Sequence, residues 1–150
     1  MKILPLLILI TFLGLSSYSQ LLKGEWEGYY VLKKIQHPIF LEFVLNTDSS
    51  YSVYSYSKGG LRLTNQGNKI YFKRDSVVVC KVYFKFLNAD SIYLEEIEVI
   101  EPKSDIGSCF QKMNLKIKIE PNKLLLVGNW SGTGCSHRSF GDITFWKKRE

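Results

Sequence analysis

Histidine and cysteine are scarce in this chain, which has two histidines and three cysteines in 150 residues. The closely spaced cysteine pairs typical of structural zinc sites are absent, so we expect no metal site. His37 and His137 lie in short segments between predicted strands, where no local motif supports a Cys–His nucleophile pair. Both histidines are therefore interpreted as loop residues.

Other signatures of catalysis are missing too. No glycine-rich loop is followed by a helix, as a phosphate-binding loop requires, and no acid–base pair or activated nucleophile can be assembled. One acidic segment suggests the carboxylate pairs of glycosidases. Its members are Glu95, Glu96, Glu98 and Glu101. Lysines on the next predicted strand can pair with them, so we interpret all four as solvated charges and expect neither an enzyme nor a cofactor.

Apolar runs long enough to cross a bilayer are also absent. The run at residues 3–15 follows Met1 and Lys2 and falls short of the roughly 18 residues that a spanning helix needs. With the small residues Ser17 and Ser19 behind it, this run predicts a secretory signal peptide over residues 1–19. The remaining residues, 20–150, are expected to form one secreted or periplasmic domain with no membrane span.

The formal charge is +6, and it falls to +5 when Lys2 leaves with the signal peptide (6 − 1). The basic residues are scattered singly along predicted strands and form no patch or binding motif, which argues against a nucleic-acid partner. Export to an oxidising compartment favours a disulfide, and three cysteines leave one unpaired. Cys80 shares a face with apolar residues and is expected to be a buried thiol, whereas Cys109 and Cys135 lie in Gly/Ser-rich connections and are predicted to pair.

What the chain does contain is alternation of period two. Residues 113–119 are apolar at every odd position and polar between, and residues 39–45 place Leu41, Phe43 and Leu45 on one side. Such alternation is typical of antiparallel sheets with one buried face. Further strands are predicted at residues 26–33, 51–57, 69–73, 77–86, 92–100, 124–130 and 143–147.

Short segments rich in Gly, Asn and Asp separate these strands, and no stretch has a helical period. We therefore predict an antiparallel meander that closes into an up-and-down barrel of about 8–10 strands, with a β-sandwich as the alternative. Ile92 and Leu94 are out of phase with Ile97 and Val99. A β-bulge near Glu95-Glu96 would place all four on the same face.

One short phrase occurs twice. Residues 22–29 read L-K-G-E-W-E-G-Y and residues 126–133 read L-V-G-N-W-S-G-T, so both contain L-x-G-x-W-x-G. Glycine next to tryptophan lets the backbone pass close to a neighbour while the indole fills the end of a barrel. We interpret the two phrases as structural elements that barrel closure brings together, with ligand contact by Trp26 or Trp130 as the alternative.

The opening G-E-W-E-G, directly after the predicted signal peptide, resembles the G-x-W opening of the lipocalins and their calycin relatives. This resemblance implies a barrel in which a basic residue near the end of the chain, Lys147 or Arg149, packs over Trp26. The chain lacks the T-D-x-x-Y motif and the final helix of that family. It also resembles small exported bacterial proteins that open with G-x-W-x-G and close with a second set of residues, a likeness that implies no activity. That closing set is Leu126, Gly128, Trp130, Cys135, Gly141, Ile143 and Phe145.

The inward phase of the predicted strands is bulky and almost wholly apolar. An eight-stranded barrel is just wide enough to be filled by such side chains or to hold one small molecule. One prediction is therefore a lipocalin-like barrel that binds a small apolar ligand through Trp26, Trp130, Phe43 and Phe84. The alternative is an exported structural or protein-interaction module with a filled core and no ligand.

Overall fold

The computed structural model describes residues 20–58, 61–63, 70–72, 77–101, 110–133 and 139–149. The predicted signal peptide at residues 1–19, the predicted Cys109–Cys135 disulfide and His137 lie outside the described residues. Within them, the dominant element is the β-strand, and the only helical segment is a short turn at residues 20–22.

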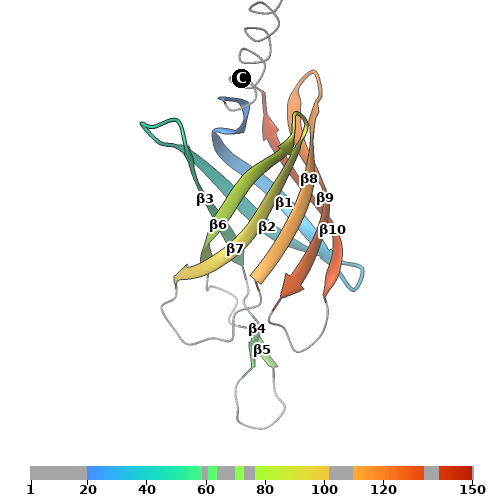
Figure 1. Ribbon diagram of the computed structural model, residues 1–150. Coiled ribbons are helices and arrows are strands. Elements are labelled where there is room, and N and C mark those ends of the chain that lie inside the picture. The colour runs from blue at the N-terminus through green and yellow to red at the C-terminus, as the bar shows by residue number, and fades with distance from the viewer. Residues whose placement is uncertain are drawn as a thin grey trace, which may run out of the picture.

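Eight antiparallel strands form a closed barrel, in the order β1-β2-β3-β6-β7-β8-β9-β10 with β10 pairing back to β1 (Figure 1). Two further strands, β4 (Leu61–Leu63) and β5 (Ile70–Phe72), form a separate two-stranded sheet. The predicted antiparallel barrel is confirmed, and the sandwich alternative is wrong. The barrel strands are β1 (Gly24–Leu32), β2 (Ile35–Leu45), β3 (Tyr51–Lys58), β6 (Val77–Asn88), β7 (Ser91–Glu101), β8 (Phe110–Ile119), β9 (Lys123–Thr133) and β10 (Phe140–Lys148).

The alternation of the sequence determines which side chains fill the barrel. On β2, Ile39, Leu41 and Phe43 are at most 1% exposed, whereas Phe40 between them is 37% exposed. Successive side chains of a strand point to opposite faces, so one phase packs inside and the other meets solvent. The core formed in this way draws side chains from all eight barrel strands.

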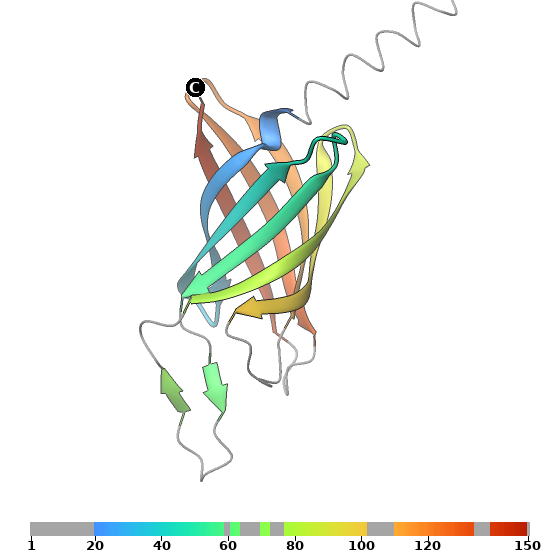
Figure 2. The same cartoon turned by 90° about the vertical axis from the view of Figure 1, so that its left-hand side faces the viewer.

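The two ends of the barrel differ (Figure 2). At one end, which we call the capped end, the turn at residues 20–22 lies across the rim and buries Leu22 and Trp26 completely. β4 and β5 lie beyond the opposite end. We call that opposite end the polar end, because the inward side chains of Tyr30, Ser55, Glu96 and Gln111 lie toward it.

β1 and β10 close the barrel, and glycines allow these strands and their neighbours to pack closely. A Cβ atom on Gly28 would lie 2.4 Å from the Phe145 ring, and one on Gly141 would lie 2.2 Å from the Val31 carbonyl oxygen. The two L-x-G-x-W-x-G phrases therefore lie on β1 and β9, on either side of β10. β10 separates the two phrases, and their tryptophans lie at opposite ends of the barrel.

β7 contains the predicted irregularity, one residue later than expected. Val82 on β6 pairs with Glu96 and Lys81 pairs with Glu98, so Ile97 is the extra residue of a bulge. The expectation that Ile97 points inward is wrong, because its side chain is 49% exposed. The bulge instead keeps Glu96 in the inward phase of Ile92 and Leu94, and this places a carboxylate inside the barrel.

Candidate functional site

The capped end is built around Trp26. Its indole Nε1 donates a 2.8 Å hydrogen bond to the Leu22 carbonyl oxygen, and its ring packs edge-on against Phe43 at 6.4 Å. The Lys147 Nζ lies 5.4 Å from the Trp26 ring centroid and donates to the carbonyl oxygens of Leu21 and Lys23. Lys147 thus takes the place over Trp26 that the lipocalin resemblance implies for a basic residue.

An aromatic cluster continues from Trp26 along the inside of β2, β3 and β6. Phe43 meets Tyr51 at 5.9 Å and Phe84 at 5.6 Å, all edge to face. Phe84 also packs against Phe86 at 5.1 Å. Of the predicted ligand-contacting residues, the structure therefore brings Trp26, Phe43 and Phe84 together at this end, where Trp26 and Phe43 are covered by the protein's own side chains.

Trp130, the fourth predicted contact residue, belongs to the polar end. Its indole Nε1 reaches over Gly141 and donates a 3.1 Å hydrogen bond to the Val31 carbonyl oxygen on β1. The Tyr30 ring packs edge-on against Trp130 at 5.0 Å and is stacked on His37 at 5.1 Å. Tyr30 and His37 face the interior yet stay half-buried, in contrast to Trp26 at the capped end.

Glu96 is the central polar group of this end, and only 6% of it is exposed. Its Oε1 accepts a 2.6 Å hydrogen bond from the Ser55 hydroxyl, and its Oε2 accepts a 2.8 Å bond from the backbone N–H of Gln111. The ladder between β7 and β8 ends at the Glu95–Lys112 pair, so the carboxylate supplies the acceptor that the bulged strand no longer offers. Burial raises the pKa of Glu96 above its ordinary value, although its two hydrogen bonds oppose this shift.

The neighbouring carboxylate behaves differently. Glu95 points outward and forms an ion pair of 3.1 Å with Lys112. The Tyr93 hydroxyl and Lys112 hold the pKa of Glu95 below its ordinary value. The interpretation of the acidic segment as solvated charges is therefore compatible with Glu95 and wrong for Glu96.

Two further groups are affected by the Glu96 carboxylate. Cys80, the directly paired neighbour of Ser55, is a buried free thiol as predicted, and burial together with Glu96 raises its pKa to about 12. Such a thiol stays protonated and is a poor nucleophile. Burial, and to a smaller extent the charge of Glu96, also raises the pKa of Tyr30. Tyr30 on β1 therefore interacts electrostatically with this cluster.

Gln111 completes the cluster with an unused acceptor. Only 9% of this residue is exposed, and among the described residues its side-chain Oε1 has no hydrogen-bond partner. Buried polar atoms without partners are rare in native proteins. The inward phase, expected to be almost wholly apolar, also contains Ser55, Glu96 and Gln111, which form a polar layer inside the barrel. The sequence carries a signal for two of these residues. Ser55 lies two positions after Val53 and Gln111 two positions before Met113, so each shares the inward face of an apolar neighbour.

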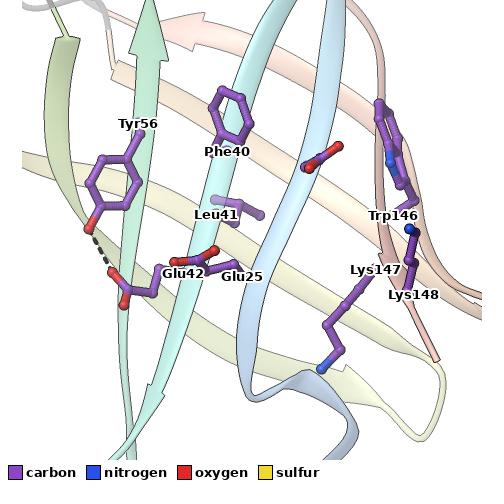
Figure 3. Close-up of a pocket in the computed structure, with 9 residues that line it drawn as sticks. Glu25, Phe40, Leu41, Glu42, Tyr56, Trp146, Lys147 and Lys148 are labelled. Carbon is purple, nitrogen blue, oxygen red and sulfur yellow. Dashed lines mark hydrogen bonds between the residues drawn. The ribbon is translucent and has the colours of Figure 1, made fainter. Parts of the chain in front are cut away.

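A second feature is an open groove of about 590 Å³ on the outer surface of β10, β1, β2 and β3 (Figure 3). The Tyr56 hydroxyl donates a 2.6 Å hydrogen bond to Glu42 Oε2 at one side of the groove, and this bond raises the pKa of Tyr56 to about 12. The lining residues are Glu25, Glu27, Phe40, Leu41, Glu42, Tyr56, Trp146, Lys147 and Lys148.

Comparison of the chain with protein-family models, with curated proteins and with solved structures finds no match. In the described part of the chain, no group of three or more His, Cys, Asp or Glu residues is placed to hold a metal ion. The described residues also include no helix that is long and apolar enough to cross a membrane.

Proposed function

We propose that the protein is an exported, lipocalin-like barrel that binds one small molecule with an apolar body and a polar group. The ligand enters through the polar end, because the turn at residues 20–22 covers the other end. Its apolar body packs against the partly buried Tyr30 and Leu32, because the core side chains deeper in the barrel are almost completely covered. This proposal keeps the apolar ligand that the sequence predicts and adds the polar group that the inner cluster requires.

The observation that carries this proposal is the unpartnered Oε1 of Gln111 beside the buried Glu96. Leaving a buried acceptor unsatisfied costs roughly 1–3 kcal/mol. A purely structural core would avoid that cost by placing an apolar side chain at position 111. A ligand that donates to this layer offsets the cost each time it binds.

The contact between Lys147 and Trp26 supports kinship with the lipocalins. The cation lies over the ring at the closed end of the barrel, where the resemblance implies it. Because Lys147 also donates to two carbonyl oxygens of the segment at residues 21–23, it fastens the cap to the last strand. A fastened cap leaves the polar end as the entrance.

Native mass spectrometry of the protein purified from its own host tests this function. We expect a complex heavier than the polypeptide by the mass of one small organic molecule, which is lost when the same sample is sprayed under denaturing conditions. If the native and denatured masses agree, and no amphiphile added afterwards binds, the proposed function is wrong.

The alternative function is an exported protein-interaction module with a filled core, and the outer groove favours it. Phe40 is 37% exposed in a groove that also contains Trp146, and aromatic side chains of this kind are enriched at protein interfaces. A Phe40→Ser/Trp146→Ser double variant separates the two functions. Loss of a co-purifying exported protein with the small-molecule complex retained would support the alternative, whereas no change in co-purification would contradict it.

A further inference from the structure

We propose that the polar group of the ligand is a primary ammonium ion, bound by Glu96 and Gln111 at the polar end. This inference rests on the proposed function and specifies the ligand class of the same site. It is carried by the unused acceptor positions of Glu96 and Gln111, by the absence of an ion pair to Glu96 among the described residues, and by the aromatic side chains of the same end.

Glu96 and Gln111 have hydrogen-bond acceptor positions that the described residues leave unused. An ionised carboxylate has about four acceptor positions, and Glu96 uses one on each oxygen, for Ser55 and for the backbone N–H of Gln111. Gln111 adds an amide oxygen with no partner among the described residues. Glu96 lies next to Glu95 on β7, and Gln111 lies next to Lys112 on β8. Because Glu95 and Lys112 are paired, the inward side chains of Glu96 and Gln111 are cross-strand neighbours.

Among the described residues, no cationic side chain forms an ion pair with this carboxylate. The ion pairs found there are Lys112 with Glu95 on the outer surface and Lys123 with Glu120, and neither involves Glu96. Lys147, which does face inward, is held at the capped end over Trp26. A buried carboxylate is costly unless it is paired, so a positive charge brought by a ligand is the natural complement.

Aromatic side chains border the same region. Tyr30 packs edge-on against Trp130, and Glu96 is close enough to raise the pKa of the Tyr30 phenol. Aromatic faces attract cations, most strongly when water is excluded. Together, Trp130 and Tyr30 with Glu96 provide aromatic and anionic contacts for the same ammonium ion.

Other head groups fit these groups less well. A carboxylate ligand would face Glu96 with like charge, and an alcohol offers only one donor and no charge. A quaternary ammonium ion carries charge but no N–H, so it would leave the Gln111 Oε1 unsatisfied. A primary ammonium ion has charge and N–H donors for both residues.

A series of octyl compounds that share one apolar body tests this assignment. Octylammonium, octyltrimethylammonium, 1-octanol and octanoate are titrated into ligand-free protein at neutral pH, and binding is followed by calorimetry. We expect octylammonium to bind roughly ten- to a hundredfold more tightly than 1-octanol, as charge-assisted hydrogen bonds are stronger than neutral ones. Equal affinities, or tighter binding of octanoate or octyltrimethylammonium, would overturn the assignment.

Three variants locate the preference within the barrel. Glu96→Gln keeps the size of the side chain but removes its charge, and Gln111→Met removes the free acceptor while leaving the backbone N–H in place. Each is expected to reduce the preference for octylammonium over 1-octanol, to near unity for Glu96→Gln and severalfold for Gln111→Met. The matched control is Glu95→Gln, which removes the same charge from the outer surface one residue away and should leave the preference unchanged.

The possible failures are distinguishable. If 1-octanol binds and octylammonium gains nothing over it, the ammonium assignment fails and the binding function stands. If no octyl compound binds the ligand-free protein, the binding function itself fails. If Glu95→Gln lowers the preference as much as Glu96→Gln does, the effect is the net charge of the surface and the assignment to the inner layer is wrong.

Discussion

The two ends of this barrel are built from the same short phrase and differ in almost everything else. Trp26 at the capped end is fully buried, bonded to the Leu22 carbonyl oxygen and covered by Lys147. Trp130 at the polar end bonds to the Val31 carbonyl oxygen and meets the half-buried Tyr30. The first tryptophan seals the barrel against its own N-terminal segment, and the second ties β9 to β1 across a glycine.

This difference separates what stabilises the barrel from what is available for binding. Aromatic and aliphatic packing dominates the capped end, and dense packing of that kind contributes the most to stability. The polar end depends on a few directional hydrogen bonds and retains an unpartnered acceptor at Gln111. Stability and binding are therefore expected to respond to substitutions at different ends.

The largest expected effect is that of Trp26→Ala. Removing a fully buried indole leaves a cavity and costs roughly 3–5 kcal/mol in the free energy of unfolding. Gln111→Met is the contrasting variant, because it replaces an unsatisfied polar group by an apolar one and should be neutral or stabilising. Urea unfolding followed by fluorescence measures both, and equal losses would abolish the distinction between the ends.

A smaller loss is expected for Gly141→Ala, where β10 closes against β1. The added Cβ atom would lie 2.2 Å from the Val31 carbonyl oxygen and 3.0 Å from the Trp130 Nε1. Strain of this kind typically costs about 1–3 kcal/mol. The change should also break the bond between Trp130 and Val31, which a red shift of tryptophan emission reports. Asn129→Ala, an exposed change on the neighbouring strand, is the control and should cause neither effect.

Lys147→Met is expected to loosen the cap without opening the core. It removes the cation over Trp26 and the two bonds to the carbonyl oxygens of Leu21 and Lys23, a loss of about 1–2 kcal/mol. Hydrogen exchange should rise at residues 20–23 and stay unchanged in β7 and β8. Lys148→Met removes the same charge from an exposed neighbour and should have little effect, so a similar loss there would show that the contact with Trp26 contributes nothing.

Much of this fold could be predicted from the sequence, because alternation of period two reports directly on a two-faced strand. The strands at residues 113–119 and 39–45 were predicted in the phase that the structure confirms, with Met113, Leu115 and Leu41 buried. The short strand β4 was not predicted, although its partner β5 lies within the strand expected at residues 69–73. The position of Lys147 over Trp26 followed from a family resemblance and not from any pattern in the residues.

The polar layer was missed for a physical reason. The extra residue of a bulge reverses the order of inward and outward side chains beyond it. The sequence does not show at which residue this reversal begins. Placing the bulge before Ile97 would bury that isoleucine and expose Glu96, whereas the structure exposes Ile97 and buries Glu96. A one-residue difference in the position of the bulge thus decides whether the barrel interior carries a carboxylate.

The smallest expected effect concerns the pH dependence of stability, where Glu95 and Glu96 should act in opposite directions. The pKa of Glu96 is raised in the folded protein, so the folded state holds its proton more tightly than the unfolded chain does. The free energy of unfolding therefore falls as the pH rises from the ordinary value of 4.5 through the raised pKa. The pKa of Glu95 is lowered, so its contribution is instead lost as the pH falls below 4.5.

Urea unfolding of the wild type, Glu96→Gln and Glu95→Gln between about pH 3 and 8 separates the two contributions. Tyr30 and Cys80 have pKa values raised above their ordinary 10.0 and 9.0, so they stay protonated throughout this range. If the Glu96→Gln protein keeps the decline in stability above pH 4.5, that decline comes from groups outside the polar layer. The difference between the two ends would then not depend on the Glu96 carboxylate.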